Sequence, residues 1–293
     1  MPSRTLVTGA TGTVGFFLVR ELSKRGEPTR AAVHTETKAA RIAEANIELF
    51  EMDFADKASI DAALKGIEKV YLLTPFSPGQ VEMAGFFIDR AVAAGVKYIV
   101  RQSVAGADTE AITLLRGHRM AEVRLEESGI PYTHLRPNSF MQNFSNFFGE
   151  AIRATGKIYL PLKAASVSYI DARDIALVGA ALLSGNIKEE RLNRAYALTG
   201  PAPLTMDNVA ASISRASGRP VEYMDISPAE AKLGMKAAGM PEWAIESMIE
   251  LYEFQRDGRG ERVSGAVEEI SGRSPLSIDD FARDNAHVFR SAA

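Results

Sequence analysis

A glycine-rich turn close to the start of the chain limits the possible folds more than any other feature of the sequence. Residues 8–15 read Thr-Gly-Ala-Thr-Gly-Thr-Val-Gly, between a short β-rich run at 4–8 and a helix-length stretch at 12–25. At such a junction Gly9 permits a tight turn, Gly12 lets backbone amides approach a diphosphate, and Gly15 lets the helix pack on the strand. The positive end of the helix dipole faces the anion there. We therefore predict a dinucleotide-binding turn with contacts from Gly9, Thr11, Gly12, Thr13, Val14 and Gly15, the alternative being a glycine-rich turn that binds nothing.

The strand-then-helix order repeats five times between residues 4 and 128. β-rich runs at 4–8, 29–34, 47–53, 69–74 and 96–103 alternate with helical patterns at 12–25, 38–45, 59–65 and 81–94. A longer helical stretch at 109–128 and a further strand at 132–135 follow. This alternation is typical of βαβ units on a parallel sheet. We predict an α/β fold with a doubly wound, Rossmann-type sheet.

The pattern changes after residue 137. An aromatic cluster and a helix to about residue 155 lead into mixed short elements, a helix at 171–184 and a strand at 195–199. Helices at 207–217, 228–239 and 242–255 and a polar tail complete the chain. We predict a dinucleotide-binding domain over 1–155, to whose sheet the strand near 195–199 returns. Residues 156–293 are predicted to form a smaller, mainly helical substrate-binding lobe.

The composition excludes several classes of site and partner. The 293 residues carry 34 Lys and Arg against 37 Asp and Glu, without a block of like charge, so the basic face that nucleic acids require is missing. The chain has no Cys, which excludes disulfides, thiolate nucleophiles and Cys-based metal sites. Its four histidines are scattered, and we predict no metal site. The longest apolar run, at 175–184, is far below the ~20 residues of a membrane span, and no apolar leader precedes the first strand. We expect a cytoplasmic protein, and the oligomeric state stays open.

Three further segments carry a family resemblance. The G-x-x-G-x-x-G spacing of the turn resembles the short-chain dehydrogenase/reductase superfamily. The runs SGIPYTHLRPNSFMQN at 128–143, VSYIDARDIA at 167–176 and GRSP at 272–275 resemble its NmrA-like family over nearly the whole chain. That family includes triphenylmethane reductase-like and quinone reductase-like enzymes and also nonenzymatic NADP-sensing regulators. The resemblance is specific for the fold and leaves the substrate open.

The end of the second strand bears on the choice between NADP and NAD. NAD-selective folds of this type carry an acidic residue there, whereas a 2′-phosphate requires cationic or hydroxyl groups. The resemblance implies an Arg at His34 and a Lys at position 38; Lys38 keeps the pattern and His34 departs from it. A nearby phosphate favours the cationic imidazole, while Glu36 argues the other way. We predict NADP rather than NAD, with a solvated helix-opening residue as the alternative role of Lys38.

The remaining cofactor contacts follow from the resemblance and from the carboxyl edge of the sheet. The resemblance implies that the Asp53 carboxylate meets the adenine amino group and that Phe54 packs on the ring, whereas the alternative for Asp53 is a turn or helix-capping role. Residues that follow parallel strands lie where ligands bind in open α/β sheets. The predicted contacts near the nicotinamide ribose are Thr74, Pro75, Ser103 and Pro137.

Residues for acid–base catalysis are scarce. The superfamily's Tyr-x-x-x-Lys pair, which shares one helix face, is matched in this sequence by Tyr159 and Lys163, but Pro161 between them does not fit a helix. The resemblance puts His118 where many relatives have a Lys, four residues before Glu122. We therefore predict that His118 hydrogen-bonds the nicotinamide ribose; acting as a general acid near pH 7 and merely capping the helix or facing solvent are the alternatives.

The scarcity of residues for acid–base catalysis limits the reactions that the chain can catalyse. Hydride transfer is chemistry of the cofactor, and acceptors such as quinones, iminium-like dyes and conjugated carbonyls need little help from the protein. We predict an NADPH-dependent oxidoreductase acting on such an acceptor. A non-catalytic NADP-binding redox sensor that acts through a protein partner is the alternative, and sugar-nucleotide epimerisation ranks last. A flat-acceptor pocket is predicted from Phe76, Phe140, Met141 and Asn143, with core packing as the alternative, above all for Phe144 and Phe148.

Overall fold

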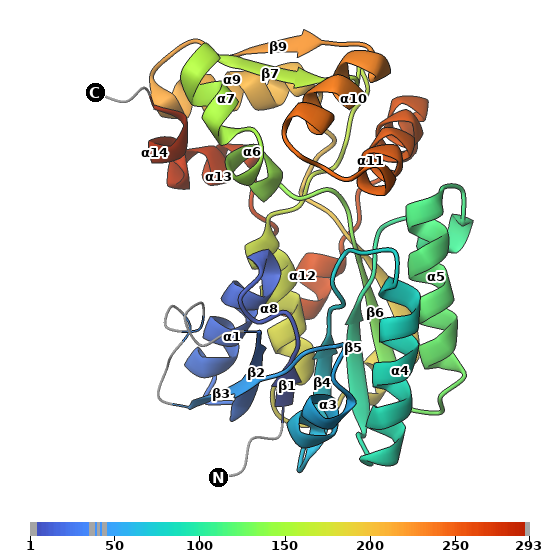
Figure 1. The fold of residues 1–293 in the computed structure, drawn as a ribbon. Coiled ribbons are helices and arrows are strands. Elements are labelled where there is room, and N and C mark those ends of the chain that lie inside the picture. Colours follow the sequence, from blue (N-terminus) through green and yellow to red (C-terminus); the bar gives the residue numbers. More distant parts are fainter. Residues whose placement is uncertain (1–4, 35–38, 40–41, 43–45, 291–293) are drawn as a thin grey trace.

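A parallel seven-stranded sheet with helices on both faces forms the larger part of the molecule. The computed structural model describes residues 5–34, 39, 42 and 46–290. The strand order in the sheet is β3-β2-β1-β4-β5-β6-β8, and all six pairings are parallel. A second sheet pairs β7 with β9, and Figure 1 shows it at the opposite end of the molecule from the N-terminus. The strands are β1 (Thr5–Val7), β2 (Thr29–Val33), β3 (Ile47–Glu51), β4 (Lys69–Leu72), β5 (Tyr98–Gln102), β6 (Tyr132–Pro137), β7 (Lys157–Leu160), β8 (Arg194–Leu198) and β9 (Glu222–Asp225).

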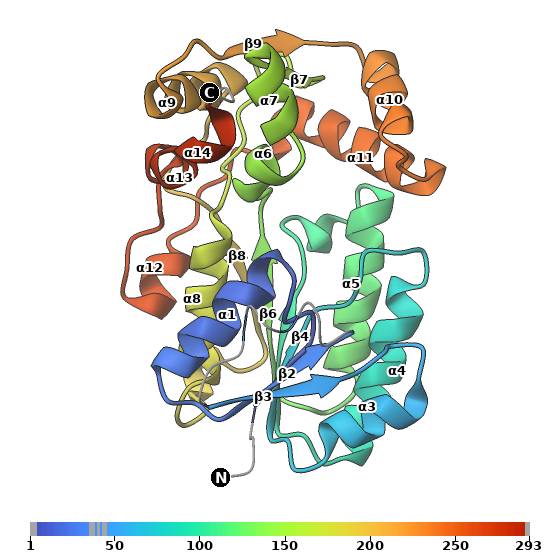
Figure 2. The same cartoon turned by 60° about the vertical axis from the view of Figure 1, so that its left-hand side comes forward.

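The helices fall into two groups around the large sheet and a third group beyond its carboxyl edge (Figure 2). On one face lie α1 (Thr13–Lys24), α8 (Ala172–Leu183) and α12 (Ala266–Ser271), and on the other α3 (Lys57–Leu64), α4 (Gln80–Ala93) and α5 (Thr113–Glu126). The predicted α/β class with a doubly wound parallel sheet is therefore confirmed. The third group contains α6 (Gln142–Asn146), α7 (Gly149–Thr155), α9 (Met206–Ser217), α10 (Pro228–Ala237), α11 (Glu242–Phe254), α13 (Ile278–Asp284) and α14 (Ala286–Phe289).

The strand order creates a crevice. The chain starts at β1 in the middle of the sheet, moves outward to β3, and then returns to β4 on the other side of β1. Such a reversal opens a space at the carboxyl ends of the strands, which is where open α/β sheets bind ligands. The β1 turn and the loop after β4 both face this space. β8 pairs with β6, His134 lying opposite Ala195, at the position where the sequence predicts a returning strand.

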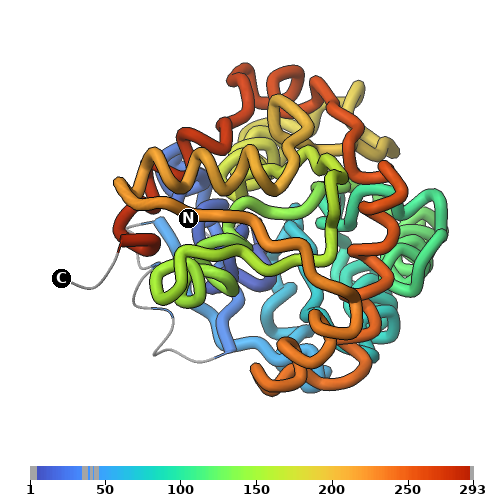
Figure 3. Tube along the Cα trace, turned by 90° about the horizontal axis from the view of Figure 1, so that it is seen from above, coloured from blue at the N-terminus to red at the C-terminus, as the bar shows by residue number. Residues whose placement is uncertain are grey.

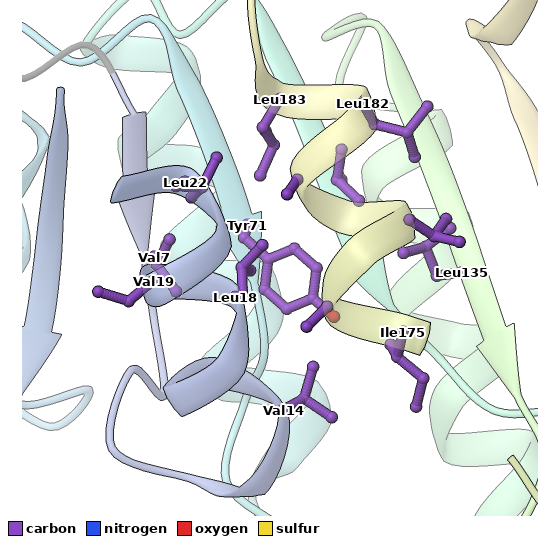
Figure 4. Packing of buried hydrophobic residues seen from close by; sticks show 14 of the residues in the cluster. Val7, Val14, Leu18, Val19, Leu22, Tyr71, Leu135, Ile175, Leu182 and Leu183 are labelled. Atoms are coloured by element: carbon purple, nitrogen blue, oxygen red, sulfur yellow. The ribbon is translucent and has the colours of Figure 1, made fainter. Parts of the chain in front are cut away.

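The core on the α1 and α8 face is closed around a tyrosine. Tyr71 of β4 is fully buried, and Figure 4 shows its ring between Leu18 of α1 and the helix α8. A Cβ on Gly179 of α8 would lie 3.0 Å from that ring, so glycine lets α8 approach. The Tyr71 hydroxyl donates to Gln102 Oε1 at 2.7 Å, which satisfies its polar atom inside an apolar layer. The close approach fixes α1, and with it the turn that precedes α1.

A second core lies beyond the carboxyl edge of the large sheet, and Figure 3 looks down on the elements that build it. Its buried residues include Met141 and Phe144 near α6, Ile158 of β7, Ile213 of α9 and Phe281 of α13. The sequence did not predict the β7–β9 pair, and it described as a polar tail the region that forms α12, α13 and α14. The chain passes between the two cores several times, since α8 and β8 lie with the large sheet and α9 with the second core. The division at residue 155 stays a prediction.

A buried aspartate ties the loop before α13 to α8. Asp174 is 3% exposed, and its Oδ2 accepts a hydrogen bond from Leu276 N at 2.9 Å. Burial raises the pKa of Asp174 to about 7. Because this value exceeds the ordinary 3.8 of an aspartate, the folded state binds a proton that the unfolded state has released between these pH values. The free energy of unfolding therefore falls as pH rises from about 4 to about 7.

We expect Asp174→Asn to stabilise the protein at pH 8, because it keeps an oxygen acceptor for Leu276 N and removes the buried charge. The gain over the parent should be about 2–4 kcal/mol at pH 8 and should shrink towards pH 5. Urea unfolding of both proteins at the two pH values measures it. The exposed Asp207→Asn serves as the matched control, and a loss of stability in Asp174→Asn at both pH values would contradict the expectation.

None of the helices in the described residues has the combined length and apolar character of a membrane-crossing segment.

Candidate functional site

The glycine-rich turn presents an uncapped helix N-terminus at the crevice. Gly9 has φ +64°, in the left-handed region, and Gly12 N donates to Gly9 O at 3.0 Å. Gly12 is the N-cap of α1 and supplies no side-chain hydrogen bond, so the first amides of the helix keep their donors available to a ligand. Thr11 and Gly12 are exposed, whereas Val14 and Gly15 are buried. A diphosphate fits this arrangement because nothing acidic lies in the first turn of the helix.

Two contacts hold the turn in place. A Cβ on Gly15 would lie 2.1 Å from Gly9 O and 2.8 Å from Ala10 Cα, so a glycine is required where α1 passes the turn. The buried Thr8 hydroxyl donates to Leu73 O at 2.9 Å and accepts from Leu73 N at 2.8 Å. These bonds join the end of β1 to the end of β4 across the strand reversal. The sequence analysis missed the role of Thr8, which a threonine directly before the turn could have suggested.

The residues predicted for the adenosine end are spread over the ends of β2 and β3. His34 is exposed after β2, and Lys38 lies outside the described residues. Asp53 is exposed and its Oδ1 accepts from Ala55 N at 2.9 Å, which is the turn role given above as the alternative. Helix α3 is capped by Asp56 instead. The contacts of Asp53 and Phe54 with adenine stay predictions.

At the opposite end of the crevice, the carboxyl ends of β4, β5 and β6 lie side by side. Thr74 and Ser103 are 6% and 4% exposed, while Pro75 is exposed. Ser103 N donates to Leu135 O at 2.7 Å, and Ala105 N donates to Pro137 O at 2.9 Å. The structure thus brings together the residues that the sequence predicts near the nicotinamide ribose, and their contacts with a cofactor stay predictions.

His118 lies on α5 beside this group. Its Nδ1 is 3.5 Å from Arg101 Nη2 of β5, and its Nε2 is 3.4 Å from the side-chain nitrogen of Gln80 at the start of α4. Burial, reinforced by the Arg101 charge, lowers the pKa of His118 to about 3. The ring is therefore neutral at pH 7. A neutral ring can still donate one hydrogen bond, as a ribose contact requires, whereas a cationic general acid near pH 7 has no support here.

A buried ion-pair network surrounds the next turn of α5. Glu122 has no exposed side-chain surface and accepts from Arg136 Nε at 2.9 Å, from Arg136 Nη2 at 2.7 Å and from Arg119 at 3.1 Å. Burial raises the pKa of Glu122, but the surrounding hydrogen bonds and positive charges, those of Arg136 first among them, together outweigh burial and hold the value at about 2. Ligand atoms of Glu122, Glu126 and His134 lie within 4.8 Å of one another. Because arginines already bind both carboxylates, this cluster has the character of an ion-pair network.

A cavity of about 430 Å³ opens next to Gln80, between the loop after β4, the start of α5 and α11. The rings of Phe76 and Trp243 meet there with centroids 4.9 Å apart. Thr113 donates to Glu250 at 2.7 Å through its amide and at 3.1 Å through its hydroxyl, which joins α5 to α11. The lining residues are Phe76, Ser77, Pro78, Gln80, Val81, Thr113, Leu114, Gly117, Trp243, Glu246, Ser247 and Glu250.

The predicted acceptor residues are divided between this cavity and the cores. Phe76 lines the cavity, while Met141 is fully buried in the second core and Phe140 packs against the core of the large sheet. Asn143 is half-buried on α6. Phe144 is 1% exposed within the second core, so core packing, the alternative given above, is confirmed for it. The sequence analysis missed Trp243, although a lone Trp on a helix of the predicted substrate lobe was a usable signal.

The Tyr-x-x-x-Lys match lies away from these residues. Tyr159 belongs to β7 in the second sheet, and Lys163 follows that strand with a φ of +49°. The two residues therefore do not share a helix face.

Comparison with known proteins gives consistent matches over most of the chain. The model of the NmrA-like family matches residues 1–280. The chain is 36% identical to an NAD(P)H azoreductase of Xenophilus azovorans, over 98% of this chain and 99% of that protein. It is 30% identical to quinone oxidoreductase 2 of Escherichia coli, over 83% and 85%. The crystal structure of Citrobacter sp. triphenylmethane reductase complexed with NADP(H) superposes with a TM-score of 0.84 at 26% identity, over 96% and 99%.

Proposed function

Because the chain belongs to the NmrA-like family, we propose that it is an oxidoreductase that uses NADPH to reduce an electron-poor aromatic or conjugated acceptor. The observation that carries the proposal is a juxtaposition at one edge of the sheet. The uncapped glycine turn follows β1, which Thr8 joins to the end of β4, and the loop after β4 lines the 430 Å³ cavity with its aromatic pair. The neutral His118 contacts Gln80, a lining residue of that cavity. Relatives that carry the names of an azoreductase and a quinone oxidoreductase support the reaction class.

The residues present fit a pyridine dinucleotide. A Cβ at Gly15 would fill the space in which Gly9 and Ala10 turn, and the freed amides at the start of α1 suit a diphosphate. A reduced nicotinamide, when bound, supplies the hydride. The residues that we expect to hold the cofactor are Gly9, Thr11, Gly12, Thr13, Val14, Gly15, His34, Lys38, Asp53, Phe54, Thr74, Pro75, Ser103, His118 and Pro137.

The chain itself has two tasks in this proposal. Phe76 and Trp243 offer apolar faces to a flat acceptor, and α11 covers the cavity so that water is displaced from the reacting atoms. His118 contributes one hydrogen-bond donor and no cation near pH 7. An acceptor in such a site has to accommodate the negative charge of the hydride without a protein cation. Quinones, azo groups and iminium-like dyes can do so.

NADPH is expected to bind at least several-fold more tightly than NADH. The sequence after β2 offers His34 and Lys38 to a 2′-phosphate, and loss of one phosphate partner weakens charge-assisted bonds. We expect Lys38→Ala to reduce the difference between the two cofactors, with Lys236→Ala as a control far along the chain. Fluorescence titration of the parent and the two variants with NADPH and NADH gives the six dissociation constants. Equal constants for NADPH and NADH in the parent would overturn the assignment.

Turnover tests the function directly. Purified protein with NADPH and a panel of quinones, azo dyes and cationic dyes should consume the absorbance of the reduced nicotinamide with at least one acceptor class. Tight NADPH binding without turnover of any acceptor would refute the reductase and favour a redox sensor. Absence of binding to either reduced cofactor would refute both.

A further inference from the structure

Arg101 is a buried charge next to His118. It lies on β5 with 1% of its surface exposed, and burial lowers its pKa to about 10, so it is still a cation at pH 7. Within the described residues no carboxylate lies at ion-pair distance from its guanidinium, and its Nη1 has no hydrogen-bond partner. The polar atom that it does approach is His118 Nδ1, 3.5 Å from Nη2. Burial of a charge without an ion-pair partner costs free energy. A buried polar group that lacks a hydrogen-bond partner therefore calls for a functional explanation.

We propose that Arg101 is a positioning residue for His118: it donates to Nδ1 and so fixes the ring as an uncharged Nε2–H donor at the edge of the cavity. The apoprotein geometry supports the existence of this donor. Its use in binding or reduction rests on the proposed function. A guanidinium can only donate. A ring nitrogen that receives its hydrogen bond must therefore carry no proton, and the proton of the neutral ring is then on Nε2.

The Nε2 side of the ring faces Gln80. Gln80, whose side-chain nitrogen lies 3.4 Å from Nε2, is itself a lining residue of the 430 Å³ cavity. With a proton on Nε2, the Gln80 amide has to present its oxygen there, which a half-turn of the amide provides. A bound oxygen acceptor can compete with Gln80 for this donor. Such an acceptor is either a ribose hydroxyl of the cofactor or the heteroatom of the substrate that becomes negative when hydride arrives.

The charges around His118 favour the neutral ring. The charged groups that act on His118 are Arg101 of β5 and Glu122, one turn later on α5, while its contact from α4, Gln80, is uncharged. Glu122 is the group that favours a cationic ring, but its carboxylate already accepts hydrogen bonds from Arg136 and Arg119. A neutral imidazole next to a cation is a stronger donor than a free one, and a neutral histidine that polarises an oxygen is an established catalytic device. The proton that completes reduction then comes from water, with hydroxide as the other product, and His118 keeps its own.

Nitrogen NMR of the apoprotein tests the proposal without turnover. Long-range ¹H–¹⁵N spectra separate the two neutral tautomers from the cation, and His118→Gln identifies the signal. In the parent we expect His118 to stay neutral with the proton on Nε2 from pH 5 to pH 8. A proton on Nδ1, or a titration within this range, would overturn the proposal even if the Arg101 variants do not fold.

Two variants and one control then isolate Arg101. Arg101→Met should let the His118 signal exchange between tautomers and should raise its midpoint by at least one pH unit, while Arg101→Lys should restore the neutral form in part. Arg194→Met, on the exposed part of β8, should change nothing. An unchanged His118 spectrum in folded Arg101→Met would contradict the assignment.

Kinetic measurements on the same variants show whether the ribose or the acceptor receives the hydrogen bond from Nε2–H. If Nε2–H serves the ribose, Arg101→Met raises the dissociation constant of NADPH; if it serves the acceptor, kcat falls and NADPH binding stays within twofold. Either result supports the proposal, and no change in both quantities contradicts it. Should the parent reduce no acceptor while its His118 has the expected tautomer, the proposed reductase fails and the structural role of Arg101 stands.

Discussion

Replacement of Gly15 by alanine is expected to weaken NADPH binding at least 100-fold. The added Cβ would lie 2.1 Å from Gly9 O and 2.8 Å from Ala10 Cα. Both are backbone atoms, so rotation of a side chain cannot relieve the clash and the backbone of the turn has to move. The amides that cradle the diphosphate move with it. A 100-fold loss corresponds to about 2.7 kcal/mol, which is on the order of one or two charge-assisted hydrogen bonds. Titration of NADPH into parent and variant measures the change.

A second glycine supplies the control for this experiment. Gly85 lies in α4, and a Cβ there would meet Arg124 Cγ at 3.6 Å, an ordinary contact. Gly85→Ala should therefore keep NADPH binding and gain about 0.5–1 kcal/mol of stability from helix propensity. Circular dichroism shows whether Gly15→Ala is folded. A folded Gly15→Ala that binds within threefold of the parent would contradict the assignment of the turn.

The sequence predicted those parts of the fold that depend on residues close together in the chain. The turn at Gly9 needs a residue that tolerates positive φ, and the strand-and-helix repeats each carry their own periodicity. The helix predicted at 38–45 lies largely outside the described residues. Parallel strands buried on both faces read as continuous apolar runs, so β4 and β5 were visible without knowledge of their partners. Thr74, Pro75 and Ser103 were predicted from the ends of their strands, because the carboxyl edge of a parallel sheet gathers those ends, whereas His118 was predicted from the family resemblance.

The parts that it did not predict depend on contacts between distant segments. β7 and β9 have four residues each, too few for a pattern, and they form a sheet because the second core aligns them. α12 and α14 have six and four residues, below the length at which a helical period can be recognised. Nothing local marks Arg101 as a neighbour of His118 or Met141 as a core residue. Such pairings are decided by packing, which a single sequence does not display.

Trp243→Ala is expected to lower kcat/KM for flat aromatic acceptors by about 10- to 100-fold, with NADPH binding unchanged. Trp243 and Phe76 are 36% and 49% exposed, so two large apolar surfaces face the cavity in place of a protein core. Loss of an aromatic face costs about 1.5–3 kcal/mol of apolar contact with a ligand that fills the cavity. The residues that line the cavity do not include any of the expected cofactor contacts, so we expect those contacts to stay intact.

The same residue provides a direct observation of binding. Trp243 is the sole tryptophan of the chain, so a change in its emission on addition of an acceptor reports the cavity alone. Trp243→Phe keeps an aromatic face and should retain most of the activity, whereas Phe76→Ala should resemble Trp243→Ala. The double variant should lose less than the product of the two single losses, because the rings share one contact and act on one ligand. An unchanged KM in Trp243→Ala, together with silent Trp243 emission in the parent, would place the acceptor elsewhere in the crevice and leave the reductase itself intact.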